Sequence, residues 1–167
     1  MSKTMNKVVI MSGVSGSGKS TLARKMRDDF LITPQNDGSR SCKTVSADTY
    51  FLRAGGYRFN LSELGNAHAE CFYSFIQAMQ NQESYNLIIV DNTNTTVEEI
   101  SPYILGASAF GYEAELVTVL PSNTTNLERC AARNIHSVSL QSILAQYRRI
   151  CDRSLPPRWK DRIVFAT

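Results

Sequence analysis

The most distinctive residues of this chain form a glycine-rich stretch close to its beginning. The pattern G-x-x-x-x-G-K-[ST] is matched in full by Gly13-Val14-Ser15-Gly16-Ser17-Gly18-Lys19-Ser20, and Thr21 follows it. In such a loop the backbone N–H groups point at phosphate oxygens, the lysine neutralises the β- and γ-phosphates, and the serine hydroxyl binds Mg²⁺. We therefore predict that residues 13–21 bind ATP, with Lys19 also catalytic and Ser20 a magnesium ligand.

Two aspartates follow short apolar segments that have the pattern of strands. Asp48 comes after residues 44–46, and Asp91 comes directly after the apolar block 87–90. Ligands of open α/β sheets gather at the carboxyl ends of strands, so both aspartates should lie near the glycine-rich loop. We predict that Asp48 is a general base and that Asp91 helps to hold Mg²⁺ or to orient Ser20. A turn cap at Asp48 and a purely structural hydrogen bond from Asp91 stay open as alternatives.

Phosphoryl transfer also needs cations that neutralise the charge on the transferred group. Arg129 and Arg133 are four residues apart on one predicted helical face, and we predict both as catalytic, with Arg133 contacting the nucleotide. Solvated surface charge is the alternative for each. His136 follows closely and either meets the nucleotide or satisfies backbone groups. Three further arginines (Arg148, Arg149 and Arg153) are expected on the surface, and His68 is expected in the core.

The residues around these groups narrow the class of reaction. No N-K-x-D element, which would read a guanine base, occurs in the sequence. The apolar block ends in Asp91-Asn92 rather than in the Asp-Glu pair with which ATP-driven motors polarise a water. A GTPase and a motor ATPase are therefore disfavoured. The sequence predicts an ATP-dependent phosphotransferase with an alcohol group as acceptor.

The pattern of elements predicts how these residues are positioned. Apolar segments at 8–11, 44–46, 87–90, 114–120 and 163–165 have strand character. Helices are predicted at 20–30, at 61–82 with Ser62 as cap, after Thr96, at 125–133 and after Ser139. Thr96 and Glu99 form a capping box, whereas Pro102 should kink or restart that helix and Gly111 should end it. We expect an α/β P-loop NTPase fold of nucleoside-kinase type, with a central parallel sheet flanked by helices and a small helical lid.

Size and composition favour a single domain over residues 1–167. The chain is 43% hydrophobic and carries a formal net charge of +3, which suits a phosphate-rich ligand but gives no basic tail. No apolar run approaches the roughly 18 to 20 residues that cross a bilayer. We expect a soluble, cytoplasmic protein with no membrane partner and no obligate protein partner. The four cysteines are far apart in sequence and are expected to be reduced and mostly buried.

Four motifs, in order along residues 8–150, resemble those of phage polynucleotide 5′-hydroxyl kinases and their relatives. They are G-V-S-G-S-G-K-S-T, S-A-D-T-Y-F, I-I-V-D-N-T-N and A-A-R-N-I-H-S-V-S. The resemblance implies that Asp48 is the general base, that the lid arginine is Arg133 or Arg129, and that the acceptor is the 5′-hydroxyl of a polynucleotide. Where this family usually has an arginine three residues after the base, the present chain has Phe51.

The segment 50–59 alternates aromatic and basic side chains, as stacking on bases with contacts to phosphates requires. The acceptor contacts that we predict are Asp48, Tyr50, Phe51, Arg53, Arg58, Asn92 and Asn94. Anchoring of the aromatic rings to the core explains the same pattern. Other acceptors remain open, namely a hydroxymethylated base in phage-type DNA, a nucleoside or a sugar. A nucleotide-binding interaction module without catalysis is the alternative from another class.

Overall fold

The computed structural model describes residues 6–33, 40–53, 56–80, 85–134 and 136–166. The end predicted at 82 for the long helix lies outside these residues. The main sheet comprises β1 (Lys7–Gly13), β2 (Cys42–Val45), β5 (Leu87–Asp91), β6 (Glu113–Pro121) and β7 (Asp161–Ala166). The helices are α1 (Lys19–Ile32), α2 (Leu64–Gln80), α3 (Val97–Ala109), α4 (Thr124–Arg133) and α5 (Leu140–Asp152).

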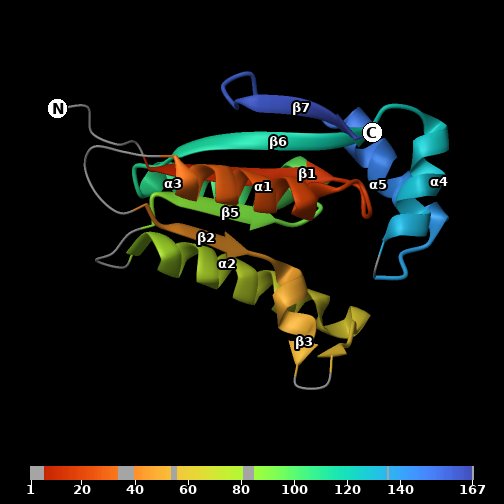
Figure 1. Ribbon diagram of the computed structural model, residues 1–167, viewed down its shortest axis with the longest axis horizontal. Helices are drawn as coiled ribbons and strands as arrows, with labels where there is room; N and C mark the ends of the chain where they lie inside the picture. Colours follow the sequence, from red (N-terminus) through yellow and green to blue (C-terminus); the bar gives the residue numbers. More distant parts are fainter. Residues whose placement is uncertain (1–5, 34–39, 54–55, 81–84, 135, 167) are drawn as a thin grey trace.

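All five strands of this sheet are parallel, in the order β2-β5-β1-β6-β7 (Figure 1). The central strand β1 is in register with β5 and β6, so that Ile10 lies beside Val90 and Leu116. Continuous apolar blocks form these strands because helices cover both of their faces. The predicted fold class is confirmed, and the carboxyl ends of β1, β2 and β5 meet at one edge.

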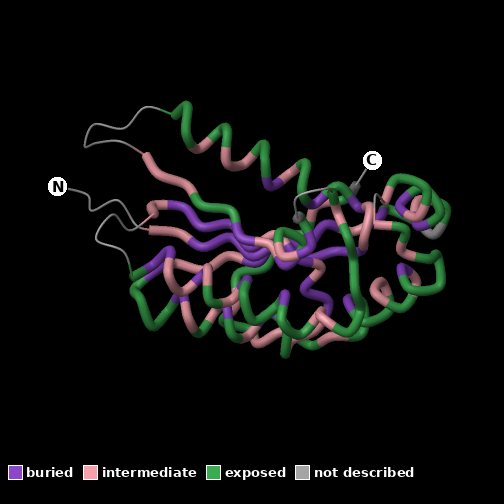
Figure 2. The backbone as a smooth tube through the Cα atoms, turned by 90° about the horizontal axis from the view of Figure 1, so that it is seen from below, coloured by how far each residue is buried: buried purple, intermediate pink, exposed green. Residues whose placement is uncertain are grey.

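Successive residues of β1 point to opposite faces of the sheet, and each face has its own helical layer. Val9 and Met11 pack with Leu22 and Met26 of α1, whereas Val8 packs in the cluster formed with α2 and α3. Figure 2 shows the buried strands between these two layers. The helices α4 and α5 lie together beyond the carboxyl ends of the strands, where the lid was predicted (Figure 1).

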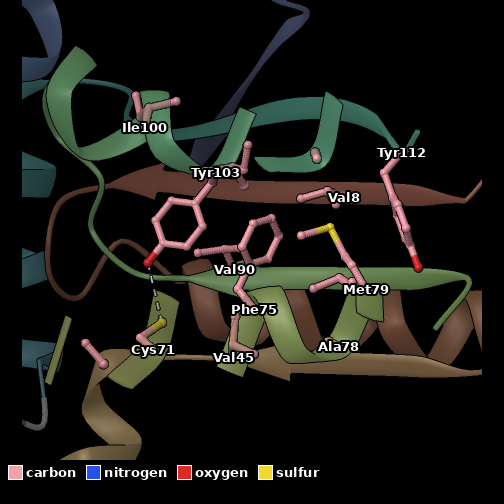
Figure 3. Close-up of a cluster of buried hydrophobic side chains, with 14 of the residues drawn as sticks. Val8, Val45, Cys71, Phe75, Ala78, Met79, Val90, Ile100, Tyr103 and Tyr112 are labelled. Atoms are coloured by element: carbon pink, nitrogen blue, oxygen red, sulfur yellow. Dashed lines mark hydrogen bonds between the residues drawn. The ribbon is translucent and has the colours of Figure 1, made fainter. Parts of the chain in front are cut away.

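Aromatic side chains join α2 to α3 on one face of the sheet (Figure 3). The rings of Phe75 and Tyr103 are 5.1 Å apart and nearly perpendicular, at 75°. The Tyr103 hydroxyl lies 3.5 Å from the Cys71 sulfur, and the Asn92 amide donates to both of these groups at 3.4 Å. This buried hydrogen-bond network connects the end of β5 to α2. It thereby holds in place the carboxyl end of β5, where the candidate site lies.

Several local predictions are confirmed and others are corrected. The capping box of Thr96 and Glu99 is present, and Gly111, at φ 74°, ends α3 with the backbone bonds of a Schellman motif. Pro102 lies inside α3 without dividing it. The helix predicted at 61–82 begins instead as a 3₁₀ turn, η2 (Leu61–Glu63), capped by Asn60 rather than Ser62.

Burial also differs in part from expectation. His68 is exposed on α2 and is not a core residue. Of the cysteines, Cys71 and Cys130 are buried, Cys42 is half-buried and Cys151 is exposed, and all are free. Within the described ranges, no helix is long and apolar enough to span a membrane.

Candidate functional site: a phosphate cradle beside a second cavity

The glycine-rich loop joins β1 to α1 and is pressed against neighbouring backbone. Gly16 has φ 76°, and a Cβ atom at this position would lie 2.0 Å from the carbonyl oxygen of Cys130 in α4. A Cβ at Gly13 would lie 2.4 Å from the carbonyl oxygen of Val119. Gly18, at φ 93°, is the N-cap of α1. The loop therefore needs glycine both for its backbone conformation and for the close approach of other chain segments.

Lys19 is buried, with 8% of its surface exposed, and its Nζ donates to the Val14 carbonyl at 2.7 Å. Burial lowers the pKa of this ammonium to about 8, against the opposing influence of Asp91 and Asp48. Among the described residues, the buried Ser17 hydroxyl has no hydrogen-bond partner. A buried cation and an unpaired hydroxyl inside a narrow glycine loop fit the phosphates of a nucleotide.

A pocket of about 440 Å³ opens over this loop. The structure brings together here most of the predicted site: Ser15, Gly16, Gly18, Lys19, Ser20, Thr21, Asp48, Asp91, Asn92 and Arg133, joined by Arg24, Thr93, Asn134 and His136. Gly13, Val14 and Ser17 do not line it. The Gly13 N–H donates to the Thr93 carbonyl, and the Val14 side chain packs with Leu127 of α4. Arg129 is exposed on α4 and also lies outside the pocket lining.

Asp91 lies at the end of β5, beside Met11 of β1. Its pKa is raised by burial, while the hydrogen bond with Ser20 and the charge of Lys19 act in the opposite direction. The Ser20 hydroxyl and a carboxylate next to it are hard oxygen donors, which suit Mg²⁺. This pair fits the predicted magnesium site.

Asp48 lies in η1 (Ala47–Phe51), directly after β2. Its carboxylate borders the pocket over the glycine-rich loop and also a second cavity of about 610 Å³. Aromatic rings (Tyr57, Phe59 and His136), apolar side chains (Leu61 and Leu64) and polar ones (His68, Glu99, Ser142, Gln146 and Arg149) line this cavity. Asp48 is thus one of the residues shared by the pocket over the glycine-rich loop and a cavity large enough for a small molecule or one end of a larger one.

The predicted acceptor contacts are only partly found at this cavity. Phe51 is 1% exposed in the core, and Tyr50 packs against the same cluster, so neither ring faces the cavity. Asn94 is 3% exposed, and its amide donates to the Met11 carbonyl at 2.8 Å. Tyr50, Phe51 and Asn94 are therefore corrected to structural positions. The alternation of aromatic and basic side chains that suggested base stacking is equally compatible with aromatic rings that are anchored to the core.

The remaining predicted acceptor contacts differ in whether they line the cavities. Asn92 borders both cavities, although its Oδ1 already accepts the Ala47 N–H at 2.9 Å. Arg58 is exposed and lines neither of the two. The side chain of Arg53 lies outside the described part of the structure.

No role was predicted for the helix after Ser139, yet this helix, α5, supports the loop. Gln146 accepts the Ser15 N–H at 2.8 Å, and its own amide donates to the Ser15 hydroxyl at 3.2 Å. Arg153, which was expected on the surface, is half-buried and donates to Ser12, to the Asn94 carbonyl and to Thr118. Both residues share the helical spacing of the buried Ile143 and Ile150, a pattern that would have revealed them.

Together, the parallel sheet, the glycine-rich loop with its buried lysine and the carboxylates at the strand ends define a P-loop protein of the kinase-like type. A family profile described as "AAA domain" matches residues 8–152. The chain belongs to that family.

Two human proteins resemble part of the chain. NEDD4-binding protein 2 of Homo sapiens is 32% identical over 136 residues, and YLP motif-containing protein 1 of Homo sapiens is 24% identical over 154 residues. Each comparison covers 81% of this chain and 7% of the human protein. The chain therefore spans a small part of these relatives.

Solved structures share the fold. Kti12 from Chaetomium thermophilum, in complex with ADP-AlF3, has a TM-score of 0.63 at 15% identity, covering 95% of this chain and 88% of that one. A gluconokinase from Sinorhizobium meliloti 1021 has a TM-score of 0.59 at 14% identity, covering 97% and 83%. The Mycobacterium tuberculosis APS kinase CysC, in complex with AMPPNP and APS, gives 0.56 at 16%, covering 95% and 88%. At these identities the likeness extends to the fold alone.

Proposed function

We propose that this chain is an ATP- and Mg²⁺-dependent kinase that transfers the γ-phosphate to the 5′-hydroxyl of a polynucleotide end. The observation that carries the proposal is the position of Asp48, whose carboxylate borders both the phosphate pocket and the second cavity. A general base in a kinase must reach the acceptor hydroxyl and lie close to the transferred phosphate at the same time. The position of Asp48 at both cavities supports this role.

In this proposal each residue has a defined task. The acceptor hydroxyl lies in the second cavity and gives its proton to the Asp48 carboxylate as its oxygen bonds to the γ-phosphorus and the bond to ADP breaks. Lys19 and Arg133 neutralise the negative charge of the phosphate oxygens. Ser20 and Asp91 hold Mg²⁺, which supplies further neutralisation of the phosphates when bound.

Two observations support a polynucleotide end as acceptor. The four ordered motifs resemble those of polynucleotide kinases, and the second cavity offers Tyr57, Phe59 and His136 as ring surfaces for stacking with a base. Arg149 at the same cavity supplies a cation for a backbone phosphate. The partner of the protein in this proposal is thus single-stranded or frayed nucleic acid.

A small hydroxyl compound is the second candidate acceptor. The position of Phe51 in the core favours it, because the arginine that polynucleotide kinases usually have at this place is missing and Arg58 lies outside the cavity. The volume of about 610 Å³ is also within the usual range for small-molecule sites. The two acceptors require the same machinery and differ only in what fills the cavity.

The test is transfer of label from γ-labelled ATP to a panel of acceptors in the presence of Mg²⁺. The panel contains 5′-hydroxyl DNA and RNA oligonucleotides, DNA with blocked ends and hydroxymethylated bases, nucleosides and simple sugars. We expect label on 5′-hydroxyl ends, and a fall in turnover by roughly two to four powers of ten in Asp48→Asn with little change in ATP affinity. Label on blocked DNA or on a small molecule would mean that this compound, and not a 5′-hydroxyl end, is the acceptor. No transfer despite ATP binding would favour a non-catalytic module.

A further inference from the structure

Asp48 receives two side-chain contacts from segments that are distant in sequence. The Tyr57 hydroxyl donates to its Oδ1 at 3.1 Å, and the Nε2 of His136 lies 3.4 Å from its Oδ2. The Tyr57 and His136 rings also touch each other, with centroids 4.5 Å apart. The carboxylate side chain itself is 52% exposed, so without these contacts it would rotate freely.

Each donor is held in place by its own segment. Tyr57 belongs to β4 (Gly56–Tyr57), which pairs with β3 (Leu52–Arg53), and the next N–H, of Arg58, donates to the Phe51 carbonyl at 3.0 Å. His136 follows Asn134, whose amide bridges the chain before and after it by bonding to the Ala131 carbonyl and to both backbone groups of Val138. Both residues thus lie next to backbone that is held by hydrogen bonds.

We propose that His136 and Tyr57 are positioning residues that fix the plane of the Asp48 carboxylate for the acceptor hydroxyl. This inference rests on the proposed function. The Tyr57 hydroxyl donates to one carboxylate oxygen and the His136 ring lies against the other, and since each oxygen has two lone pairs, one on each stays free to accept a proton. With both oxygens engaged, the carboxylate no longer rotates, and a free lone pair stays directed into the second cavity. Such prior orientation is worth a large factor in rate, because misplacement by about 1 Å can cost roughly 100-fold.

The first test is kinetic. We expect His136→Ala to lower kcat by roughly 10- to 100-fold and Tyr57→Phe by a smaller factor, with ATP affinity changed less than about threefold. His136→Gln, whose amide can donate from nearly the same place, should restore most of kcat. Glu128→Ala on the exposed side of α4 and Tyr73→Phe on the exposed side of α2 are matched controls and should leave kcat unchanged. Equal defects in the Ala and Gln variants, or a defect confined to the KM for ATP, would overturn the proposal.

A double substitution separates positioning from any independent task of His136. If His136 acts through Asp48, adding His136→Ala to Asp48→Asn should change the remaining kcat by less than about twofold. Fully additive losses would mean that His136 acts on its own and is not a positioning residue for Asp48.

A spectroscopic measurement needs no acceptor. The chain has two histidines, so the side-chain ¹⁵N resonances of His136 can be followed at fixed pH, with those of His68 as an internal reference. Asp48→Asn should displace the His136 signals and leave the His68 signals in place. Unchanged His136 signals would show that the contact does not form and would overturn the inference, whatever the panel of acceptors reveals. Displaced signals in a protein that phosphorylates none of the acceptors would instead count against the proposed function.

Discussion

At the scale of single residues, Lys19 stands out because its charge is buried. Burial lowers its pKa from 10.5 to about 8, so between these pH values the unfolded chain binds a proton that the folded chain does not. The contribution of this group therefore stabilises the folded state progressively as pH rises from about 8 to 10.5. Below pH 8 Lys19 is charged in the folded protein, and the burial of this charge lowers the free energy of unfolding by its full amount.

Lys19→Met should consequently stabilise the nucleotide-free protein at pH 7, by up to roughly 3 kcal/mol for a shift of this size. The advantage over the wild type should shrink as pH rises from about 8 towards 10.5, because the wild-type lysine is then neutral in the folded state and no longer buries a charge. Urea unfolding of both proteins at several pH values between 7 and 10.5 measures this difference, and other titrating groups cancel in the comparison. Parallel stability curves would contradict the lowered pKa.

At the scale of elements, the glycine-rich loop depends on its contact with α4. Gly16 and Gly111 have nearly the same backbone conformation, at φ 76° and 74°, but a Cβ at Gly16 would meet the Cys130 carbonyl whereas a Cβ at Gly111 has open space around it. Gly111→Ala should cost only the strain of the left-handed conformation, roughly 1–2 kcal/mol. Gly16→Ala should cost at least about 2 kcal/mol more, because backbone must move.

Urea denaturation of the two glycine variants measures this difference directly. Nucleotide binding by Gly16→Ala gives a second measurement, because displacement of the loop from α4 should weaken binding while Gly111→Ala leaves it intact. Equal losses of stability in the two variants would mean that the loop and α4 are not in close contact.

The other link between α5 and the site is Arg153, which donates to groups of β1, of the chain after β5, and of β6. Arg153→Met should cost about 2–4 kcal/mol, since it removes three hydrogen bonds from buried partners. Arg148→Met on the exposed side of the same helix should stay within about 0.5 kcal/mol of the wild type. Thermal or urea unfolding distinguishes the two. A small loss at Arg153 would assign it to the surface, as the sequence suggested.

The features that could be predicted from the sequence are those that depend on residues close together in the chain. The apolar blocks around Ile10 and Val90, the phosphate loop and the capping box at Thr96 are specified by neighbouring residues, and each was predicted in the correct place. The spacing from Ile143 and Ile150 indicates the side of α5 on which Arg153 lies, but its partners, like the exposure of His68, depend on which helix packs on which strand. The role of segment 50–59 was ambiguous for the same reason, because aromatic rings serve cores and bases alike.

At the scale of the whole molecule, the site exists only where separate parts of the chain converge. The parallel register brings Asp91 beside Met11 at the sheet edge, η1 adds Asp48 after β2, and the chain after α4 adds His136. None of these segments forms the pocket alone. A ligand that bridges them should therefore stabilise the folded protein as a unit.

Because separate segments converge at the site, we expect a bound nucleotide to raise the thermal stability of the whole protein. A ligand that binds only the folded state at a free concentration 100-fold above its Kd adds about 2.7 kcal/mol of stability, which corresponds to a rise in Tm of roughly 5–10 °C for a chain of this size. We expect ATP with Mg²⁺ to produce this rise in the wild type, with a smaller rise when Mg²⁺ is removed by chelation. Lys19→Ala should lose most of the effect, because the buried ammonium that meets the phosphates is gone, whereas Arg148→Met should keep it. Differential scanning calorimetry measures all four cases. An equal rise in Lys19→Ala would mean that the nucleotide binds elsewhere, and the assignment of the loop as the phosphate site would fall with it.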